Sequence, residues 1–278
     1  MQGRLSPPFD GRVQFFPTPD WKAEFSRAAE AGFTSIEWLY DTASKGVNPI
    51  ETETGRAEID EITNRTGIAV NSLCAHFFVE NPLVRGRGAE LEDLLETLTG
   101  LISYCGLARV ERLVLPFLEN GGIRSAEDEH RAKEVISEIV SVANAARVEI
   151  HLECDLAPRE YARFLDRLPH SIRVLYDTGN STAGGYKVED EMAAYASRIG
   201  SVHLKDRMIR GKSVPLGKGE ANLGHRIESL LTAGYQGDFI LEAARGETGQ
   251  EVEWAKRNLS LVRSLVEEIH SGAASQAT

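Results

Sequence analysis

The chain has 278 residues, a formal net charge of −11 and an isoelectric point near 5.2. This length can bury a large core in one or two domains, and so acidic a chain repels the phosphate backbone of nucleic acids. The three cysteines, Cys74, Cys105 and Cys154, lack metal-motif spacing and are few, as is typical of the reducing cytosol. The first residues form no apolar leader, and no apolar run could span a bilayer. We therefore expect a cytoplasmic protein without nucleic-acid or membrane partners.

Short apolar segments with strand character alternate with longer segments of helical periodicity. The predicted strands cover, in chain order, residues 2–5, 34–39, 68–73, 111–115, 148–153, 172–177, 201–205 and 238–242. The predicted helices cover residues 23–31, 56–66, 90–107, 126–146, 158–168, 188–198, 226–233 and 252–269. Gly32 and Gly67 are expected to end the first two helices, and Pro116 to stop the fourth strand.

This alternation predicts the fold class. About eight strand–helix units are what a closed (β/α)8 barrel requires. The strands are almost entirely apolar, as in a parallel sheet that is buried on both faces. No linker rich in Pro, Ser or Gly divides the chain. The sequence therefore predicts an α/β protein with a single TIM barrel over residues 1–270, followed by a small polar tail, residues 271–278, that is frayed and disordered.

Four predicted strands end in, or next to, a side chain that can bind a metal ion. Glu153, Asp177 and Glu242 lie at the ends of the fifth, sixth and eighth strands, and His203 lies near the end of the seventh. Barrel enzymes carry their chemistry at the C-terminal ends of their strands. Because neighbouring strands are about 4.8 Å apart, these side chains can converge on one cation. Three carboxylates and an imidazole, with no thiolate, suit Mn²⁺, Mg²⁺ or Co²⁺ at least as well as Zn²⁺, and we expect Mn²⁺ first.

Several short motifs resemble those of a known family. They are Leu152-Glu153, Asp177-Thr178-Gly179-Asn180, Val202-His203-Leu204-Lys205-Asp206, Leu216-Gly217-Lys218-Gly219-Glu220 and Ile240-Leu241-Glu242. In order and spacing they resemble the xylose-isomerase-like TIM barrels, in particular the sugar (phosphate) isomerase and epimerase branch. The resemblance covers nearly the whole chain. It implies that Glu153, Asp177, His203 and Glu242 bind one divalent metal, and that Glu153 and Glu242 flank the substrate as acid and base.

These roles are chemically coherent. Epimerising a carbon next to a ketone requires a weakly acidic C–H bond to break, and a metal can stabilise the enediolate that forms. Glu153 and Glu242 come from strands that are not neighbours, so they could face each other across a bound sugar. Aldose–ketose isomerisation uses the same groups, and the sequence leaves both reactions open.

Further residues are predicted to contact substrate. Glu37 lies at the end of the second strand, and the resemblance implies that it lies near the substrate or supports a metal ligand. The alternative is that it forms an ion pair with a Lys or Arg inside the barrel. His76 follows the third strand, and the alternative for it is an ordinary loop histidine. Asn180 stands where many family members have His, and an amide cannot shuttle a proton. Lys205 shares the inward face of its strand with His203 and could meet substrate or a ligand carboxylate.

Positive charge near the barrel mouth bears on whether the substrate is an anion or a neutral sugar. The segment 216–220 could present backbone amides and Lys218 to an anion, or be a plain turn. Arg245 and Arg4 could add further charge. Convergence of two of these cations would favour a sugar phosphate over a neutral sugar, and we lean slightly towards the phosphate. The expected partner is thus a small sugar or sugar phosphate, and a homo-oligomer is compatible with the sequence.

Three alternatives remain open at this point. A metal-dependent dehydratase of the inosose or sugar-acid type would use the same ligands and differ in its product. A nuclease of the endonuclease IV type would need more histidine ligands than the seven histidines of this chain supply at strand ends. A non-catalytic sugar-binding barrel would hold metal without turnover.

Overall fold

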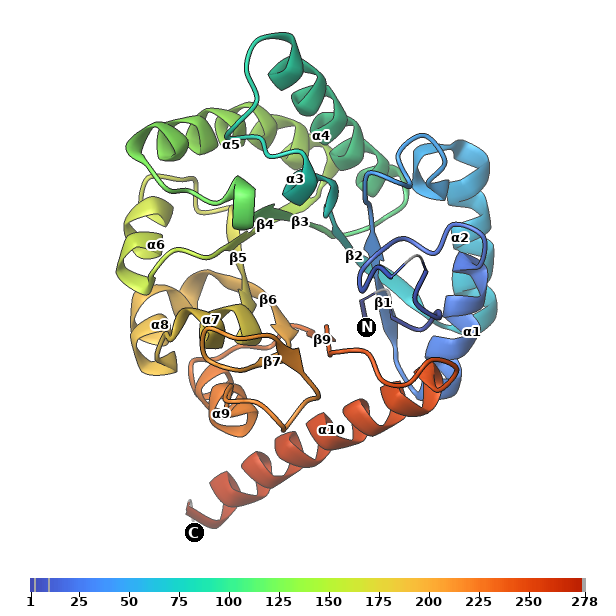
Figure 1. Cartoon of the computed structure of the whole chain (residues 1–278), viewed down its shortest axis with the longest axis vertical. Coiled ribbons are helices and arrows are strands. Elements are labelled where there is room, and N and C mark those ends of the chain that lie inside the picture. The colour runs from blue at the N-terminus through green and yellow to red at the C-terminus, as the bar shows by residue number, and fades with distance from the viewer. Residues whose placement is uncertain (3, 10, 277–278) are drawn as a thin grey trace.

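The computed structural model describes residues 1–2, 4–9 and 11–276, which form a ring of parallel strands surrounded by helices (Figure 1). The ring strands are β1 (Ser35–Leu39), β2 (Ala69–Cys74), β3 (Arg112–Phe117), β4 (Glu149–Cys154), β5 (Arg173–Asp177), β6 (Ile199–Leu204) and β9 (Phe239–Leu241). They follow one another in chain order around the sheet, and every neighbouring pair is parallel. The predicted TIM-barrel class is confirmed.

Helices follow the strands and cover the outside of the ring. They are α1 (Trp21–Ala31), α2 (Glu53–Thr66), α3 (Phe77–Glu80), α4 (Ala89–Leu107), α5 (Ala126–Ala146), α6 (Pro158–Leu165), α7 (Thr178–Gly184), α8 (Val188–Tyr195), α9 (Leu223–Thr232) and α10 (Glu251–Gln276). Single 3₁₀ turns occur at Pro49–Glu51, Glu119–Gly121 and Ala196–Arg198. None of the helices described here is long and apolar enough to cross a membrane.

The predicted first strand is much shorter than the others. The main-chain N–H of Gln2 donates to the carbonyl of Leu241 at 3.2 Å, and the N–H of Glu37 donates to the carbonyl of Met1 at 2.9 Å. Met1 and Gln2 thus bridge β9 and β1 where an eighth strand would stand. Residue 3 lies outside the described residues. Because so few residues pair on each side, the segment forms an isolated bridge rather than a strand.

Three other boundaries differ from the sequence prediction. Pro116 lies inside β3 instead of ending it, because proline removes a donor but has a φ that an extended strand tolerates near its end. The short helix α7, which the sequence analysis did not predict, follows β5 directly. Helix α10 runs to Gln276, through most of the predicted tail, while residues 277–278 lie outside the described part.

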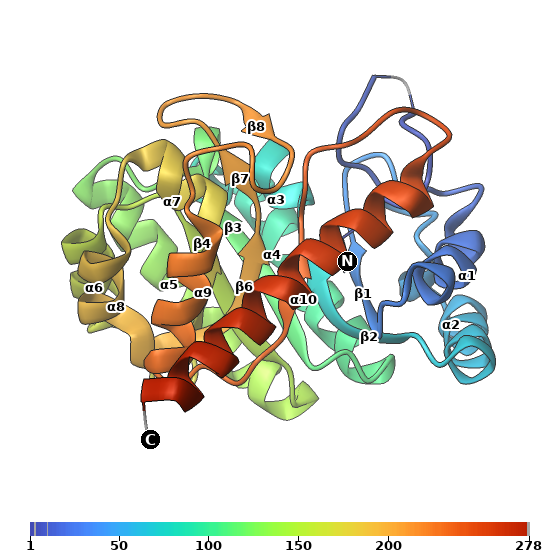
Figure 2. The same ribbon diagram turned by 90° about the horizontal axis from the view of Figure 1, so that it is seen from below.

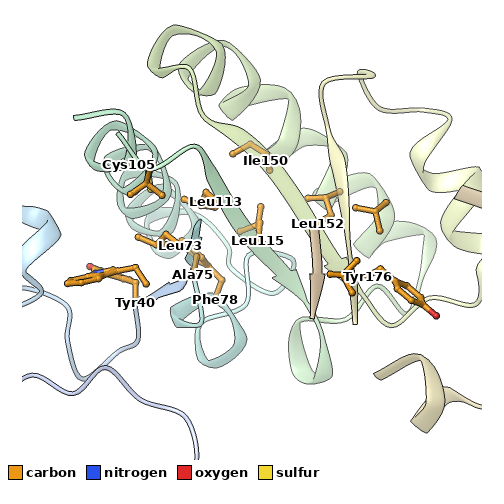
Figure 3. Close-up of a cluster of buried hydrophobic side chains, with 14 of the residues drawn as sticks. Tyr40, Leu73, Ala75, Phe78, Cys105, Leu113, Leu115, Ile150, Leu152 and Tyr176 are labelled. Carbon is orange, nitrogen blue, oxygen red and sulfur yellow. The ribbon is translucent and has the colours of Figure 1, made fainter. Parts of the chain in front are cut away.

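A continuous apolar core fills the space between sheet and helices (Figure 3). Leu73, Leu113 and Leu115 on the strands are fully buried, as is Cys105 on α4. Burial of this kind contributes about 25 cal/mol for each Å² of apolar surface removed from water. The core therefore holds the strands in fixed register, and with them the side chains at their C-terminal ends.

Strands β7 (Asp206–Arg207) and β8 (Ser213–Val214) form a small antiparallel hairpin directly after β6. Figure 2 shows this hairpin at the same end of the barrel as α3. That end carries the C-terminal ends of the ring strands, where the predicted site residues lie.

Candidate metal centre and active site

A cavity of about 940 Å³ opens at the C-terminal ends of the strands. Glu153 of β4, Lys205 and Glu242 form part of its wall, together with Asn180 of α7 and His76. Asp177 and His203 do not line it directly, but Lys205, which does, contacts Asp177. The structure therefore brings the predicted acidic cluster together at the base of a cavity large enough for a sugar.

Asp177 is oriented by the start of helix α7. Its Oδ1 accepts the main-chain N–H groups of Gly179 and Asn180, each at 2.8 Å, so the carboxylate caps the helix. Its Oδ2 has no hydrogen-bond partner of acceptable geometry among the described residues, and the Nζ of Lys205 lies 2.9 Å away. One oxygen is thus used to fix the side chain while the other remains available as a ligand.

His203 is oriented by a second carboxylate that lies deeper in the barrel. Its Nε2 lies 2.7 Å from Glu37 Oε1, and Glu37 also accepts hydrogen bonds from Gln2 and Ser72. Glu37 therefore keeps a proton on Nε2, and Nδ1, which lies 2.9 Å from Glu242 Oε2, is the nitrogen that would bind a metal ion after losing its own proton. Glu37 is buried and does not line the cavity, so it supports His203 and is not placed to contact substrate.

Glu153 is held by the residue that stands in place of the family's histidine. The side-chain amide of Asn180 donates to Glu153 Oε1 at 2.9 Å, and its carbonyl oxygen accepts from Arg207 Nη1 at 2.9 Å. Asn180 therefore links the predicted acid–base glutamate to the β7–β8 hairpin. Sequence reasoning placed Asn180 at the substrate, and the structure places it at the cavity wall beside Glu153.

Glu242 is surrounded by cations. Its Oε1 lies 2.6 Å from Lys205 Nζ and 3.0 Å from Arg4 Nη2, and its Oε2 lies 2.9 Å from His203 Nδ1. Lys205 also contacts Asp177, so its ammonium group holds positive charge between two predicted metal ligands. Arg4 donates to the main-chain carbonyls of Glu242 and Ala243 as well, which fixes the end of β9.

Burial and charge separate the two glutamates. Burial, reinforced by Asp177, raises the pKa of Glu153 to about 8. Burial alone would also raise the pKa of Glu242, but Lys205, His203 and Arg4 hold it well below its usual value. Burial opposes charge on His203 too, yet Glu37 and Glu242 raise its pKa well above the ordinary range. These surroundings thus favour the protonated form of Glu153 and the ionised form of Glu242.

The donor set fits a divalent cation. One ligand atom from each of Glu153, Asp177 and His203 lies within 4.8 Å of the others, and all three residues are buried. Asp177 Oδ2 and His203 Nδ1, which make no hydrogen bond of acceptable geometry, belong to this group. When Glu37, Glu153, Asp177 and Glu242 are all ionised and His203 is neutral, as ligands must be, Lys205 and Arg4 supply only two positive charges against four negative ones, and a divalent ion would balance the difference. Glu242 lies next to these three residues, but its own carboxylate oxygens already contact Lys205, Arg4 and His203.

The remaining predicted residues are placed as follows. His76 lines the cavity, and burial lowers its pKa, so its ring is neutral near pH 7. Arg245 lines the rim and donates to the main-chain carbonyls of Ser6 and Val13. Lys218 is exposed and is not among the residues that line the cavity. The structure therefore does not bring Lys218 to the site.

The loop around Lys218 is also not an anion-binding loop. The carboxylate of Asp206 accepts the main-chain N–H groups of Gly217, Gly219 and Ala221 at 2.9–3.1 Å. A Cβ added at Gly219 would lie 2.2 Å from Asp206 Oδ1, so glycine is needed for this close approach. The amides that the sequence analysis offered to an anion are thus already occupied by a buried carboxylate.

Sequence reasoning missed several residues that line the cavity. Arg207, Lys212 and Tyr186 lie on one wall, with Arg124 nearby in a bidentate ion pair with Asp155. Arg207 had a usable signal, since it follows His203 and Lys205 at two-residue spacing and so continues one face of an extended segment. The others come from loops, where sequence spacing does not indicate direction.

Comparison with known proteins agrees with this fold. Residues 25–265 match the family model described as "Xylose isomerase-like TIM barrel", and the chain belongs to this family. It is 24% identical over 271 residues to L-ribulose-5-phosphate 3-epimerase UlaE of Salmonella heidelberg (strain SL476), which covers 86% of this chain and 90% of the relative.

Solved structures give the same picture of the fold. An L-ribulose 3-epimerase superimposes with a TM-score of 0.78 and 15% identity, over 100% of this chain and 97% of the other. A D-psicose 3-epimerase with D-tagatose, from Clostridium cellulolyticum H10, gives 0.70 and 17%, over 88% and 93%. These structures confirm the fold, and the family model together with the sequence relative confirms the predicted assignment to the sugar isomerase and epimerase enzymes.

Proposed function

We propose that the protein is a divalent-metal-dependent 3-epimerase of a ketose or ketose phosphate. The observation that carries this proposal is the convergence of Glu153, Asp177 and His203 at the base of the cavity, with Glu242 2.9 Å from His203. The printed names of the relatives, which are 3-epimerases of ketoses and of a ketose phosphate, support the same reaction and substrate class.

Glu153, Asp177, His203 and Glu242 would hold the ion. Mn²⁺ is our first choice, and Mg²⁺, Co²⁺ and Zn²⁺ also suit oxygen and imidazole ligands. When bound, the cation supplies Lewis acidity that polarises the substrate's carbonyl and an adjacent hydroxyl oxygen. Glu37 would keep the imidazole of His203 in the binding tautomer.

Glu153 and Glu242 would move the proton. They come from β4 and from the end of β9, with β5 and β6 between them, so they approach a bound sugar from two sides. One carboxylate removes the proton from the carbon next to the carbonyl, and the other delivers a proton to the opposite face. In the reverse direction the two residues exchange roles.

Lys205 and Asn180 would position these groups. Lys205 keeps Glu242 ionised through its 2.6 Å contact, and Asn180 fixes one oxygen of Glu153. His76, neutral at the cavity wall, can donate to or accept from a substrate hydroxyl. The predicted role of each side chain thus follows from a contact that it already makes, or from its place on the wall.

The test is hydrogen exchange in D₂O. Protein stripped with a chelator and reloaded with one metal at a time is incubated with a panel of ketoses and ketose phosphates. NMR should find deuterium at C3 of the epimerised product. Glu153→Gln and Glu242→Gln should each slow exchange by about 10³-fold or more, because removing a catalytic acid or base typically loses 10²–10⁴-fold. Glu149→Gln, at the other end of β4, is the matched control.

The outcomes separate the alternatives. Epimerisation without any deuterium uptake would favour hydride transfer and reject the two-glutamate scheme. A product lacking one water would identify a dehydratase on the same scaffold. Metal binding with no turnover across the panel would favour a non-catalytic barrel.

A further inference from the structure

Two cations on the β7–β8 hairpin line the cavity without a carboxylate partner. Arg207 donates to the carbonyl of Gly211 through Nε and Nη2, and to Asn180 Oδ1 through Nη1. These acceptors are all neutral, and two of its five N–H groups remain unused within the described structure. The side chain of Lys212 makes no hydrogen bond or ion pair with any residue described, while its main-chain carbonyl accepts from the N–H of Met208 at 3.2 Å. The hairpin therefore presents uncompensated positive charge to the cavity.

Other cations of the cavity already have partners. Lys205 and Arg4 are paired with Glu242, Arg124 is paired with Asp155, and Arg245 donates to the main-chain carbonyls of Ser6 and Val13. In a chain of net charge −11, two cations that face a cavity without an acidic partner are positioned to attract an anion. The contrast places the unpaired charge on one wall, away from the acidic base of the cavity.

This wall is held rigidly. The carboxylate of Asp206, which precedes Arg207 in the chain, binds three main-chain N–H groups of the segment 217–221. Glu220 accepts from the N–H of Ile209 in the hairpin turn at 2.7 Å. Because the hairpin is fixed both to β6 and to this segment, its two cations need little reorganisation to bind a ligand.

The hairpin also lies at a useful distance from the proposed reacting centre. Arg207 Nη1 and Glu153 Oε1 are separated by one side-chain amide, that of Asn180, and two hydrogen bonds of 2.9 Å. An open-chain pentulose whose C3 lies at Glu153 can reach across this gap with its terminal carbon. The end group of such a substrate would then meet Arg207, Lys212 and the neighbouring Ser213.

We infer that Arg207 and Lys212 form a subsite for the terminal phosphate monoester of a ketose phosphate. The inference rests on the proposed function, and it chooses the phosphorylated substrate over the free sugar. A phosphate has three peripheral oxygens and carries nearly two negative charges at pH 7, which matches a guanidinium fork, an ammonium group and a hydroxyl. A carboxylate has one charge and two oxygens, and so leaves one cation unpaired.

The decisive variant is Lys212→Ala, since Lys212 makes no contact whose loss would disturb the fold. It should lower kcat/KM for a ketopentose 5-phosphate by about tenfold or more, as expected for losing a hydrogen bond to a charged group. The value for the unphosphorylated ketopentose should change by less than about twofold. Arg210→Ala, an exposed cation of the same hairpin that does not line the cavity, is the matched control and should alter neither value.

Arg207 gives a second, graded readout. Arg207→Ala should lower kcat/KM for both substrates, because Asn180 and Glu153 lose their support, and more for the phosphate. Arg207→Lys keeps the charge and should restore part of the phosphate preference. Equal preference for phosphate over sugar in wild type, Lys212→Ala and Arg207→Ala would overturn the subsite.

A binding assay distinguishes failure of the subsite from failure of the proposed function. Inorganic phosphate is titrated into the metal-loaded protein by calorimetry, with no substrate present. Binding that weakens about tenfold in Lys212→Ala but not in Arg210→Ala supports the subsite even if no ketose is turned over. Unchanged phosphate binding in Lys212→Ala, or tighter binding of a sugar acid than of phosphate, would reject the phosphate assignment while leaving epimerase activity untouched.

Discussion

The two ends of the central strands carry similar residues with opposite consequences. At the N-terminal end, His151 of β4 lies between Ser201 Oγ, 2.7 Å from Nδ1, and Glu149 Oε2, 3.0 Å from Nε2. At the C-terminal end, His203 of β6 has Glu37 at Nε2, but its Nδ1 makes no hydrogen bond of acceptable geometry among the described residues. Both rings are fully buried, so burial does not distinguish them.

The difference lies in the atoms left without partners. A buried polar atom normally has a hydrogen-bond partner, and an exception calls for an explanation. We call the N-terminal end of the strands the lower end of the barrel and the C-terminal end the upper end. At the lower end each ring nitrogen of His151 has a hydrogen-bond partner, which makes His151 a structural residue. At the upper end the exceptions, His203 Nδ1 and Asp177 Oδ2, cluster beside Glu153. Their neighbours at 2.9 Å, Lys205 Nζ for Asp177 Oδ2 and Glu242 Oε2 for His203 Nδ1, belong to the same cluster of charged side chains. The site is therefore recognised by ligand atoms that converge, rather than by residue type.

The largest expected effect follows from removing one of these atoms. Asp177→Asn or His203→Gln should weaken binding of the divalent ion by more than about a hundredfold, beyond the 10–100-fold typical of outer-shell changes, and should abolish most activity. His151→Gln is the matched control at the other end of the barrel and should retain full metal content. Metal content is measured by elemental analysis after dialysis, and affinity by competition with a chelator.

The interpretation of the upper end would fail if both Asp177→Asn and His203→Gln kept stoichiometric metal. It would fail equally if His151→Gln lost metal as readily as they do. The first result would remove the ligand assignment, and the second would show that the two ends are not independent.

A smaller effect should follow from changing the support of His203. Glu37→Gln keeps the size of the side chain but removes the charge that holds the proton on Nε2. Metal affinity should fall by about 10–100-fold, the usual range for such partners, while KM for the substrate changes little because Glu37 does not line the cavity. A rise in KM with unchanged metal affinity would restore the substrate-contact role that the sequence analysis proposed.

The fold could be predicted from the sequence because its signals are local and repeated. The apolar strands and the apolar stripe of α5 can be identified directly from the sequence pattern, and α5 was predicted at its observed bounds. The length of the first strand was overestimated because the pairing of Met1–Gln2 depends on partners that are distant in the sequence, β9 and β1. Helix α7 was not predicted because it begins at the N-cap that Asp177 provides, and Asp177 had been interpreted only as a ligand.

The candidate site was predicted in part for the same reason. Strand ends fix where Glu153, Asp177, His203 and Glu242 point, so spacing indicated that they would lie together. Loops do not have this property: Lys218 turned away from the cavity, and Arg207 and Lys212 turned towards it. The sequence also could not reveal that Asp206 occupies the amides of segment 217–221, since that contact depends on tertiary structure.

The smallest expected effect concerns the pH dependence of stability at the lower end of the barrel. Burial lowers the pKa of His151, only partly opposed by Glu149, so the folded state prefers the neutral ring. The unfolded chain takes up this proton near pH 6.5, and stability is therefore present above that pH and is lost as pH falls. His151→Gln removes the titration. Between pH 7 and pH 5 the wild type should lose roughly 1 kcal/mol more unfolding free energy than the variant. The pKa of Glu149 is lowered by its bond to His151, so this carboxyl titrates below the window. Urea unfolding of both proteins with chelator present gives the difference, in which the contributions of the metal-site residues cancel. A parallel dependence on pH in the two proteins would mean that His151 is protonated in the folded barrel and that the lower end, too, carries a charged histidine.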